Sequence, residues 1–363
     1  MTRVVIIGAG PAGSSAAFHL ASAGFEVTII ERAAFPRVKV CGEFISPGAT
    51  EVLEAILPAR DLLDAGARRV DRLVLELGDR AAAWTLPTPA WAISRAGLDV
   101  MLLQRAGRAG ARVEQPASVR AVKYADDGVT VMLGDGRSLD AEIVIHADGS
   151  GRHDPAGPVP CDERLVGHKC HLRVPGGVQG VRMRAGRGAY VGTIQVEGDL
   201  ATCALVARKA RIAEVGGNAD EMLRRLWPAY DPAWRAGEWK SCGVARSRYI
   251  RPGHPRSFRI GNAAAAVDPI GGEGIGLALW AGLELARLLA ASASDIATAQ
   301  RLLAVAYSRR LRTRLPACRA AGELLMREGL VRALWPLTNV PWLVMRPWYA
   351  MTGKPIRGTA AGA

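Results

Sequence analysis

Residues 3–31 read RVVIIGAGPAGSSAAFHLASAGFEVTIIE. An apolar, β-branched run ends in glycines, a helical pattern follows to about Ala23, and a second apolar run begins after Gly24. This order predicts a strand, a helix and a second, parallel strand, which together form a βαβ unit of about 30 residues. Such a unit opens a doubly wound α/β domain, so we predict an α/β fold class for this part of the chain.

The glycine-rich turn of this stretch has the spacing GxGxxG, formed by Gly8, Gly10 and Gly13. In such a turn the first glycine permits the tight bend, the second lets the backbone approach a pyrophosphate, and the third lets helix and strand pack closely. The helix that begins at Pro11 and Ala12 then offers free N–H groups to phosphates. Glu31 ends the second strand, where a carboxylate binds ribose hydroxyls. We therefore predict a dinucleotide site, and the turn alone does not distinguish FAD from NAD.

The length of 363 residues favours more than one domain. Between Leu165 and Ile250 the pattern changes to alternating strands, and helical patterns run from about Gly274 through Leu334. We predict a β-rich substrate domain inserted into a discontinuous nucleotide-binding domain, with a helical C-terminus. The predicted ranges are 1–65, 92–155 and 255–310 for the nucleotide-binding domain, 66–91 and 156–254 for the β-rich domain, and 311–363 for the C-terminal segment.

Composition and cysteine spacing exclude several classes of protein. With 49% hydrophobic and 22% charged residues the chain is globular rather than disordered, and no apolar run reaches the roughly 18 residues of a membrane span. The first residues lack the pattern of a signal peptide and the six cysteines have no CxxC spacing, so we expect reduced thiols and a cytoplasmic location. Zinc-site spacing is also missing from the one His and Cys cluster, so we predict no metal. That cluster consists of Cys161, His168, Cys170 and His171.

Basic residues are concentrated at the end of the chain. The net charge is +13, and residues 301–363 hold eleven basic residues against Glu323 and Glu328, which places +9 there. A basic segment of this kind suits anionic partners such as phosphates, acidic carriers or lipid headgroups. No nucleic-acid recognition motif accompanies the charge, so we do not expect a nucleic acid partner.

The segment Leu330–Met351 (LVRALWPLTNVPWLVMRPWYAM) combines three tryptophans, aliphatic residues and prolines within this basic region. Three interpretations remain open for it: ordinary packing against the cofactor domain, a lid over the substrate cavity, and a patch that lies on an anionic membrane surface. The third interpretation adds membrane association to the expected cytoplasmic location.

Two later segments repeat the combination of glycines with an acidic residue. The first is Ala147–Gly151 (ADGSG), and the second is Gly261–Ile275 (GNAAAAVDPIGGEGI). Together with the N-terminal turn they resemble the motifs of the flavoprotein monooxygenase superfamily and, within it, of the geranylgeranyl-reductase-like branch. The resemblance covers roughly residues 1–60, 90–150 and 255–300. It implies a Rossmann-like FAD-binding domain of the glutathione-reductase type.

The resemblance also implies where FAD lies against these segments. Asp148 and Gly149 are expected near the pyrophosphate. The loop with Gly272 and Gly274 is expected to run against the flavin ring, and the helix that follows turns its positive end toward the part of the ring that is negative in reduced flavin. Asn262 stands where the family has Asp, and its amide group is still able to bond to ribityl hydroxyls.

The loop Arg37–Pro47 (RVKVCGEFISP) resembles a segment of the branch that lies beside the flavin ring. Cys41 in this loop is our candidate catalytic residue, and the alternative is a small buried apolar side chain. Arg95 matches the family's arginine at the phosphate or ribityl region, and the alternative is an ion pair with Asp99. The complete set of residues that we expect to contact FAD is Gly8, Gly10, Pro11, Ala12, Gly13, Glu31, Arg32, Lys39, Cys41, Gly42, Arg95, Val122, Asp148, Gly149, Asn262, Asp268, Pro269, Gly272, Gly274 and Ile275.

The resemblance implies an FAD-dependent oxidoreductase, and only one dinucleotide fingerprint is present. We therefore expect NADH or NADPH to donate electrons during a transient visit. Three functions remain open, in this order: a monooxygenase that hydroxylates or epoxidises an apolar, aromatic or polyketide-like small molecule through an oxygenated flavin; a reductase that saturates a substrate double bond; and a non-catalytic lipid-binding protein. The WxWxIP motif of flavin halogenases is absent, and Gly188–Val196 does not match the YxWxFPK-like motif of isoprenoid reductases.

Overall fold

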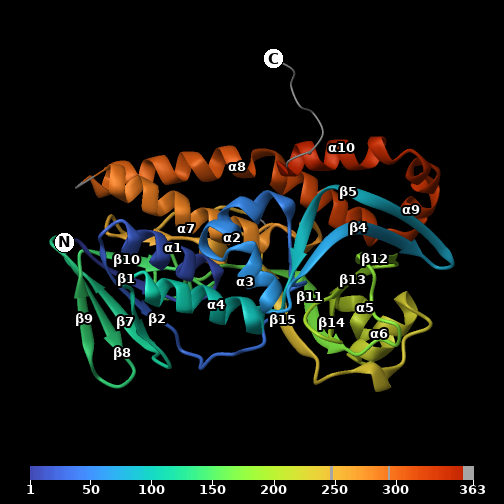
Figure 1. The fold of residues 1–363 in the computed structure, drawn as a ribbon, viewed down its shortest axis with the longest axis horizontal. Helices are drawn as coiled ribbons and strands as arrows, with labels where there is room; N and C mark the ends of the chain where they lie inside the picture. The colour runs from blue at the N-terminus through green and yellow to red at the C-terminus, as the bar shows by residue number, and fades with distance from the viewer. Residues whose placement is uncertain (246–247, 293–294, 355–363) are drawn as a thin grey trace, which may run out of the picture.

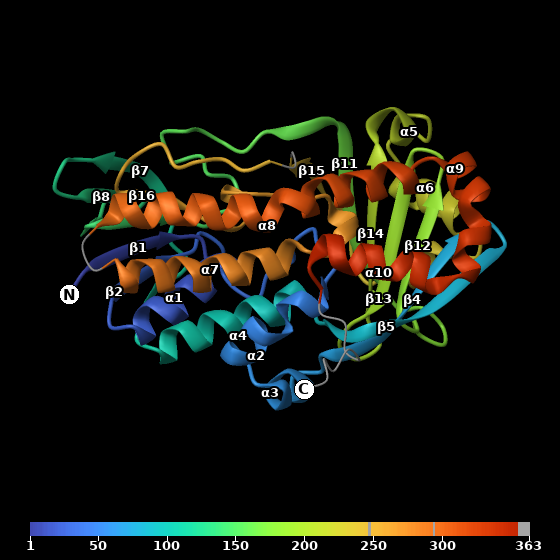
Figure 2. The same cartoon turned by 90° about the horizontal axis from the view of Figure 1, so that it is seen from above.

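The computed structural model describes residues 1–245, 248–292 and 295–354. Figure 1 shows an elongated molecule in which a nucleotide-binding half and a half built on one large sheet lie end to end. The helices of the C-terminal region run along one long side of both halves (Figures 1 and 2).

The nucleotide-binding half is built on a five-stranded parallel sheet in the order β16-β10-β1-β2-β6. Its strands are β1 (Arg3–Ile7), β2 (Glu26–Ile30), β6 (Arg112–Glu114), β10 (Ile143–His146) and β16 (Ser257–Arg259). One face is covered by α1 (Pro11–Ser22), α4 (Arg95–Arg108) and α7 (Gly274–Ala291), whose apolar side chains form one buried cluster with those of the strands. The predicted α/β class and its opening βαβ unit are confirmed.

The other face of this sheet is covered by a small antiparallel sheet. Its strands are β7 (Val119–Tyr124), β8 (Val129–Leu133) and β9 (Ser138–Ala141). Val131 of β8 packs in one cluster with Val5 of β1 and Val144 of β10. Because both faces are covered, the central strands are apolar on both sides.

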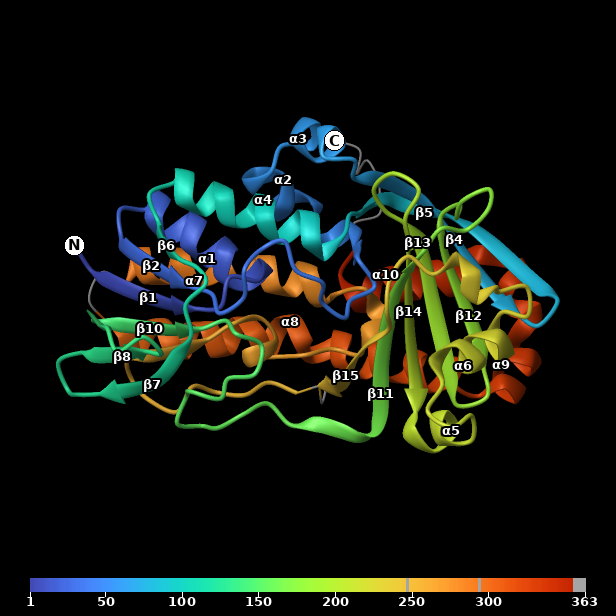
Figure 3. The same cartoon turned by 90° about the horizontal axis from the view of Figure 1, so that it is seen from below.

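The second half is an eight-stranded sheet in the order β15-β11-β14-β13-β12-β4-β5-β3. Its strands are β3 (Phe44–Ile45), β4 (Arg68–Leu77), β5 (Arg80–Ala92), β11 (Cys161–Leu172), β12 (Val181–Gly186), β13 (Ala189–Gln195), β14 (Ala201–Arg208) and β15 (Lys240–Ala245). Strand β3 belongs to this sheet although it falls within the range 1–65 that we predicted for the nucleotide-binding domain. The outer face packs on α5 (Lys209–Ala213) and α6 (Ala219–Leu226), as seen from below in Figure 3.

Helices α8 (Ile296–Leu325), α9 (Glu328–Leu334) and α10 (Pro341–Thr352) lie along both halves (Figure 2). Met345 and Tyr349 of α10 are buried against Trp84 of the large sheet. The inner face of α10 therefore packs on the large sheet, whereas the packing interpretation placed the C-terminal segment against the cofactor domain. The remaining helices are α2 (Thr50–Ile56), α3 (Ala59–Asp64) and the short 3-10 helices η1 (Pro47–Ala49), η2 (Pro232–Trp234), η3 (Gly261–Ala263), η4 (Pro269–Gly271) and η5 (Trp335–Asn339).

Helix α7 has the length and the mean hydropathy, 1.5, of a membrane span. However, 56% of it is buried inside the protein. It packs against α1 and contributes Ala281 and Leu285 to the buried cluster of the nucleotide-binding half. These contacts are those of a core helix in a globular domain.

Candidate cofactor and active site

The three glycines of the N-terminal turn are needed for different physical reasons. Gly8 has φ +103°, and a Cβ there would lie 2.6 Å from the Cα of Asp148. A Cβ at Gly13 would lie 1.9 Å from the carbonyl oxygen of Gly8. A Cβ at Gly10, by contrast, would meet only two guanidinium groups, 3.7 Å from Nη2 of Arg95 and 3.9 Å from Nη2 of Arg37. Gly8 and Gly13 are therefore required by the fold, whereas Gly10 keeps open a space that two cations face.

These two arginines are held in place by buried carboxylates. Arg95 binds Asp99 through Nε and Nη2, at 2.7 and 2.8 Å, and Arg37 lies 3.5 Å from Asp99 and 3.4 Å from Glu31. Burial opposes the charge of Arg95, but the Asp99 carboxylate more than compensates and raises its pKa. The Nε of Arg37 is buried without a hydrogen-bond partner. An anionic pyrophosphate in the space at Gly10 would supply one, so these residues fit the phosphates of FAD.

Glu31 lies at the carboxyl end of β2, where the sequence predicts a ribose-binding carboxylate. Its oxygens accept hydrogen bonds from the backbone N–H groups of Ala9 and Ala33, both at 3.0 Å. Its own carbonyl accepts from the N–H of Ala117 at 2.8 Å, which brings the segment before β7 to the same edge. Val122, our predicted contact on β7, packs instead against the apolar cluster under the small sheet. The backbone of Ala117, which we did not predict as a contact, is thus bonded directly to that of Glu31, whereas the side chain of Val122 packs in the apolar cluster.

The loop after β10 meets the loop after β16 at the same edge of the sheet. Asp148 accepts a hydrogen bond from the N–H of Gly151 at 2.9 Å, which holds the turn in which Gly149 has φ +78°. A Cβ at Gly149 would lie 4.0 Å from the Cβ of Asn262, which is exposed in η3. Two predicted FAD contacts that are distant in sequence therefore lie next to each other at this edge of the sheet.

The segment before α7 forms a close loop against the large sheet. Gly272 has φ +61°, and a Cβ there would lie 2.5 Å from a ring carbon of Phe44. A Cβ at Gly274, the first residue of α7, would meet nothing within 4 Å. The N-terminus of this 18-residue helix carries no side-chain cap, so no side chain accepts from its first N–H groups, and its positive dipole end lies at this loop. This environment suits the electron-rich edge of a flavin ring.

Two acidic residues of this loop, Asp268 and Glu273, bind partners within the protein. Asp268, a predicted cofactor contact, accepts from the hydroxyl of Tyr190 at 3.0 Å and from the N–H of Ile270 at 3.1 Å, and burial raises its pKa. Asp268 therefore caps η4, which begins at Pro269. Glu273 is buried and lies 2.6 Å from the ammonium of Lys354, which follows α10.

Glu43 is the centre of a buried network that the sequence did not reveal. One carboxylate oxygen accepts from Nζ of Lys169 at 2.5 Å, and the other from Nε2 of His171 at 2.9 Å and from the hydroxyl of Thr202. The N–H of Arg95 completes the set at 2.6 Å. Burial opposes ionisation of Glu43, but the bond to His171 and the charge of Lys169 more than compensate and lower its pKa to about 2. The loop of Cys41 is thereby tied to the large sheet.

Cys41 lies two residues before this carboxylate and is half-buried. Its sulfur accepts from the N–H of Glu43 at 3.4 Å, and part of its side chain packs on the cluster of Trp91 and Ile275. Gly42 and Arg32 are exposed, and burial together with the charge of Arg37 lowers the pKa of Lys39. Cys41 thus has both an apolar contact and an accessible side.

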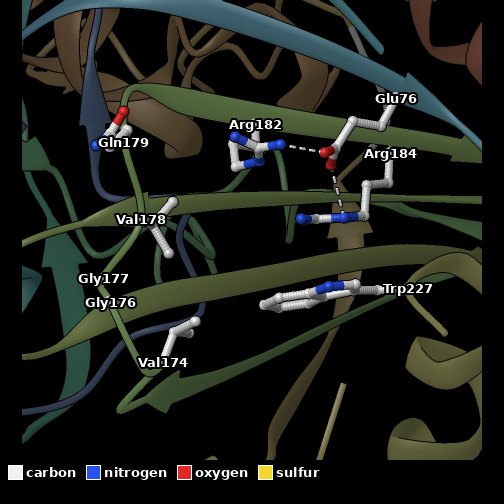
Figure 4. A pocket seen from close by; sticks show the side chains of 9 residues that line it. All are labelled: Glu76, Val174, Gly176, Gly177, Val178, Gln179, Arg182, Arg184 and Trp227. Carbon is white, nitrogen blue, oxygen red and sulfur yellow. Dashed lines mark hydrogen bonds and ion pairs between the residues drawn. The ribbon is translucent and has the colours of Figure 1, made fainter. Parts of the chain in front are cut away.

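The cavities on the large sheet lie away from these residues. One, of about 360 Å³, is lined by Glu76, Arg182, Arg184 and Trp227 (Figure 4). In it Glu76 pairs with both arginines, and Arg184 stacks 4.0 Å over the ring of Trp227. A second cavity, of about 820 Å³, shares the lining residues Val178 and Gln179 with the first. By strand alternation these side chains of β4 and β12 point to the face opposite the one that carries Lys169.

The histidines near Cys161 have partners of their own. His171 binds Glu43, whereas His168, on the other face of β11, lies 2.7 Å from the hydroxyl of Ser241. Within the ranges that the structure describes, no group of three His, Cys, Asp or Glu side chains has an arrangement that would hold a metal ion.

Known proteins are similar to the chain at three levels. A family model described as an FAD binding domain matches residues 1–153. A menaquinone reductase of Mycobacterium tuberculosis is 30% identical over 325 residues, which cover 79% of this chain and 76% of that protein. A digeranylgeranylglycerophospholipid reductase of Methanopyrus kandleri is 31% identical over 307 residues, which cover 77% and 78%.

Solved structures share the fold at lower identity. The flavin-dependent brominase Bmp2 superposes with a TM-score of 0.78 at 18% identity and covers 99% of this chain and 95% of its own. PqsL of Pseudomonas aeruginosa, described as a probable FAD-dependent monooxygenase, has a TM-score of 0.78 at 18% identity, with 92% and 99% covered. The family match, the relatives that align over more than three quarters of the chain and the shared architecture all indicate the same FAD-dependent family. The chain therefore belongs to the flavoprotein monooxygenase superfamily, in its geranylgeranyl-reductase-like branch, and is an FAD-dependent oxidoreductase.

Proposed function

We propose that this protein is an FAD-dependent reductase of an apolar lipid of the isoprenoid-quinone class. From the sequence alone we placed oxygenation first. The relatives that match more than three quarters of the chain carry the names of reductases, and their similarity extends beyond the nucleotide-binding half. The unmatched YxWxFPK-like motif of isoprenoid reductases bears equally on both substrate types that those names suggest, since both carry isoprenoid chains. The choice between them rests on the longer match, because the menaquinone reductase covers 79% of this chain and the phospholipid reductase 77%. A quinone lipid is therefore our first candidate.

The observation that carries the proposal is the position of the Cys41–Glu43 loop. It lies between the cofactor segments and the large sheet, and its conformation is held by the buried bonds of Glu43 to Lys169 and His171. When bound, reduced FAD supplies a hydride, which together with one proton saturates a double bond. The thiol of Cys41 packs on the cluster that includes Ile275 of α7, and it is our candidate for donating that proton.

The other residues bind and orient. Arg37 and Arg95, which face Gly10, would bind the pyrophosphate, and Glu31 would bind the ribose. Asn262 and Gly149 border the path between the phosphates and the ring. We propose that NADH or NADPH reduces the flavin during a transient visit, since the chain carries one dinucleotide fingerprint.

The test begins with anaerobic titration of the purified flavoprotein with NADH and with NADPH, followed by addition of a menaquinone. Products are analysed by mass spectrometry after exposure to air. Saturation of a side-chain double bond adds two hydrogens that survive air, whereas reduction of the quinone ring alone is reversed. Return of unchanged quinone, with no stable product, contradicts the proposed double-bond reduction.

Oxygen transfer is the competing function, and the same samples test it. Turnover under ¹⁸O₂ with aromatic or polyketide-like compounds would give a product heavier by one labelled oxygen atom. Label in the product, together with no reduction of the quinone lipid, would favour a monooxygenase and overturn the reductase proposal.

A further inference from the structure

Large apolar side chains are exposed together on the C-terminal helices. Of the twelve that are exposed in the described ranges, six belong to α9, η5 and α10, with exposed fractions of 42–60%. They are Leu330, Leu334, Leu337, Trp342, Leu343 and Met351. Monomeric proteins rarely keep a large apolar patch exposed without a partner, so six such side chains on three successive helical elements point to an interaction surface. We call this patch together with the outer side of α8 the C-terminal face.

Helix α10 is apolar on both sides. Its inner side is satisfied, because Met345 and Tyr349 pack on the large sheet. The exposed positions recur at helical spacing: Trp342, Leu343, Arg346, Pro347, Ala350 and Met351. One arginine is thus the only charged residue among these exposed positions of α10, and the large apolar side chains there are 42–60% exposed.

The same face is positively charged. Helices α8 and α10 lie side by side along it in both Figure 1 and Figure 2. Arg309, Arg312 and Arg319 of α8 and Arg346 of α10 are exposed, and among the described residues none of them forms an ion pair. The nearby carboxylates are already neutralised, since Glu323 pairs with Arg208 and Glu328 with Arg332. The face therefore combines unpaired arginines with exposed aliphatic and indole groups.

We propose that the C-terminal face docks on the surface of an anionic lipid bilayer. Apolar side chains that enter the headgroup boundary, flanked by arginines that meet anionic lipids, are the features of interfacial membrane helices. A second copy of the chain is a poorer occupant, because a two-fold contact would bring Arg346 and the α8 arginines of both copies together. A nucleic acid would use the charge but leave the apolar side chains in water.

The face is also connected to the cofactor loop. Directly after α10, the ammonium of Lys354 lies 2.6 Å from Glu273 and 3.4 Å from the carbonyl oxygen of Gly271. The docked helix would thus lie next to the segment that we assign to the flavin ring. The docking surface itself does not depend on the reductase function, but it would bring such an enzyme to a lipid-dissolved substrate.

Sedimentation of the FAD-loaded protein with vesicles tests the proposal. The vesicles contain phosphatidylcholine alone or with 30 mol% phosphatidylglycerol, at low and at high salt. We expect binding to the anionic vesicles at least tenfold stronger than to the neutral ones, with partial loss at high salt. Equal recovery in the supernatant with and without anionic vesicles at low salt would overturn the proposal.

Four variants locate the surface. Leu343→Glu and Arg312→Glu are each expected to weaken binding at least tenfold. Leu63→Glu on α3 and Arg120→Glu on β7 change equally exposed residues elsewhere and should bind like the unmodified protein. Bound-flavin absorbance and circular dichroism verify that each variant is folded. Retained binding in both C-terminal variants, or a stable dimer that buries these residues and does not bind vesicles, rejects the proposal. Because no turnover is measured, failure of the reductase proposal leaves this result unaffected.

Discussion

The ammonium of Lys169 lies 2.5 Å from a carboxylate oxygen of Glu43, and both side chains are fully buried although 126 residues separate them. The first belongs to the large sheet and the second to the loop that carries Cys41. Glu43 has φ +56°, and within the described ranges it is the only non-glycine residue with a positive φ. A backbone strained in this way persists where the surroundings over-determine it, and four hydrogen-bond donors do so here. The network therefore fixes the loop between the two halves of the molecule.

Replacement of Glu43 by Gln should destabilise the protein by about 3–5 kcal/mol at neutral pH, because it leaves the charge of Lys169 buried without a counter-charge. The folded-state pKa of about 2 lies below the ordinary value of 4.5. The ionised carboxylate therefore stabilises the fold above pH 4.5, and this contribution is lost as the pH falls toward 2. Urea unfolding at several pH values should show a smaller acid-induced loss in the variant. The exposed Glu26→Gln is the control, and an acid profile unchanged by Glu43→Gln would contradict the assignment.

Gly10→Val should yield a folded protein without FAD. Gly10 has φ −73°, which valine tolerates, and a Cβ there would meet only the ends of two arginine side chains, at 3.7 and 3.9 Å. The added methyl groups would occupy the space where we place the pyrophosphate. Visible absorbance and circular dichroism measure the two properties separately. Gly329→Val, at another open position, should keep its flavin. Stoichiometric flavin in Gly10→Val would refute the phosphate site.

Asn262→Asp should be tolerated and should retain FAD with equal or higher affinity, since the side chain is exposed opposite Gly149 and keeps its acceptor oxygen. Fluorescence titration of the apoprotein with FAD provides the dissociation constant. A loss of affinity of tenfold or more would mean that the NH₂ group of Asn262 donates a bond that a carboxylate is unable to replace.

Cys41→Ser should lower kcat at least tenfold and leave the flavin spectrum unchanged, because a serine hydroxyl at this position is a much weaker acid than the thiol. Steady-state kinetics and absorbance spectra are compared with those of Cys161→Ser, which changes an exposed thiol. Unchanged kinetics in Cys41→Ser would support the alternative in which the side chain only packs.

Lys354→Met should lower both the Tm and the affinity for FAD. The substitution leaves the buried carboxylate of Glu273 with Arg314 alone, 3.5 Å away, beside the loop that precedes α7. Breaking a buried pair of this kind costs on the order of 3 kcal/mol. Thermal unfolding with and without added FAD measures both effects, with the exposed Lys240→Met as control. Equal Tm and equal flavin affinity would show that the C-terminal residues do not support the cofactor loop.

The parts of this protein that depend on local sequence were predictable. The run from Arg3 to Glu31 specifies its βαβ unit because the apolar period, the glycine spacing and the helix stop at Gly24 act over a few residues. The three glycine-rich segments were recognisable for the same reason. Glycine is needed in these segments because their turns require a positive φ, as at Gly8, Gly149 and Gly272. This requirement is local and holds wherever such a turn occurs.

Contacts between distant segments were decided only by the tertiary structure. Nothing local in β11 indicates that Lys169 and His171 meet Glu43, since a buried lysine on an alternating strand is indistinguishable in sequence from an exposed one. The same holds for Lys354 and Glu273, and for the small strand β3 that joins the large sheet. Charge pairs and strand pairings are set by which surfaces the whole fold brings together. Sequence periodicity indicates which face of a helix or strand is buried, but it does not indicate which other helix or strand packs against that face.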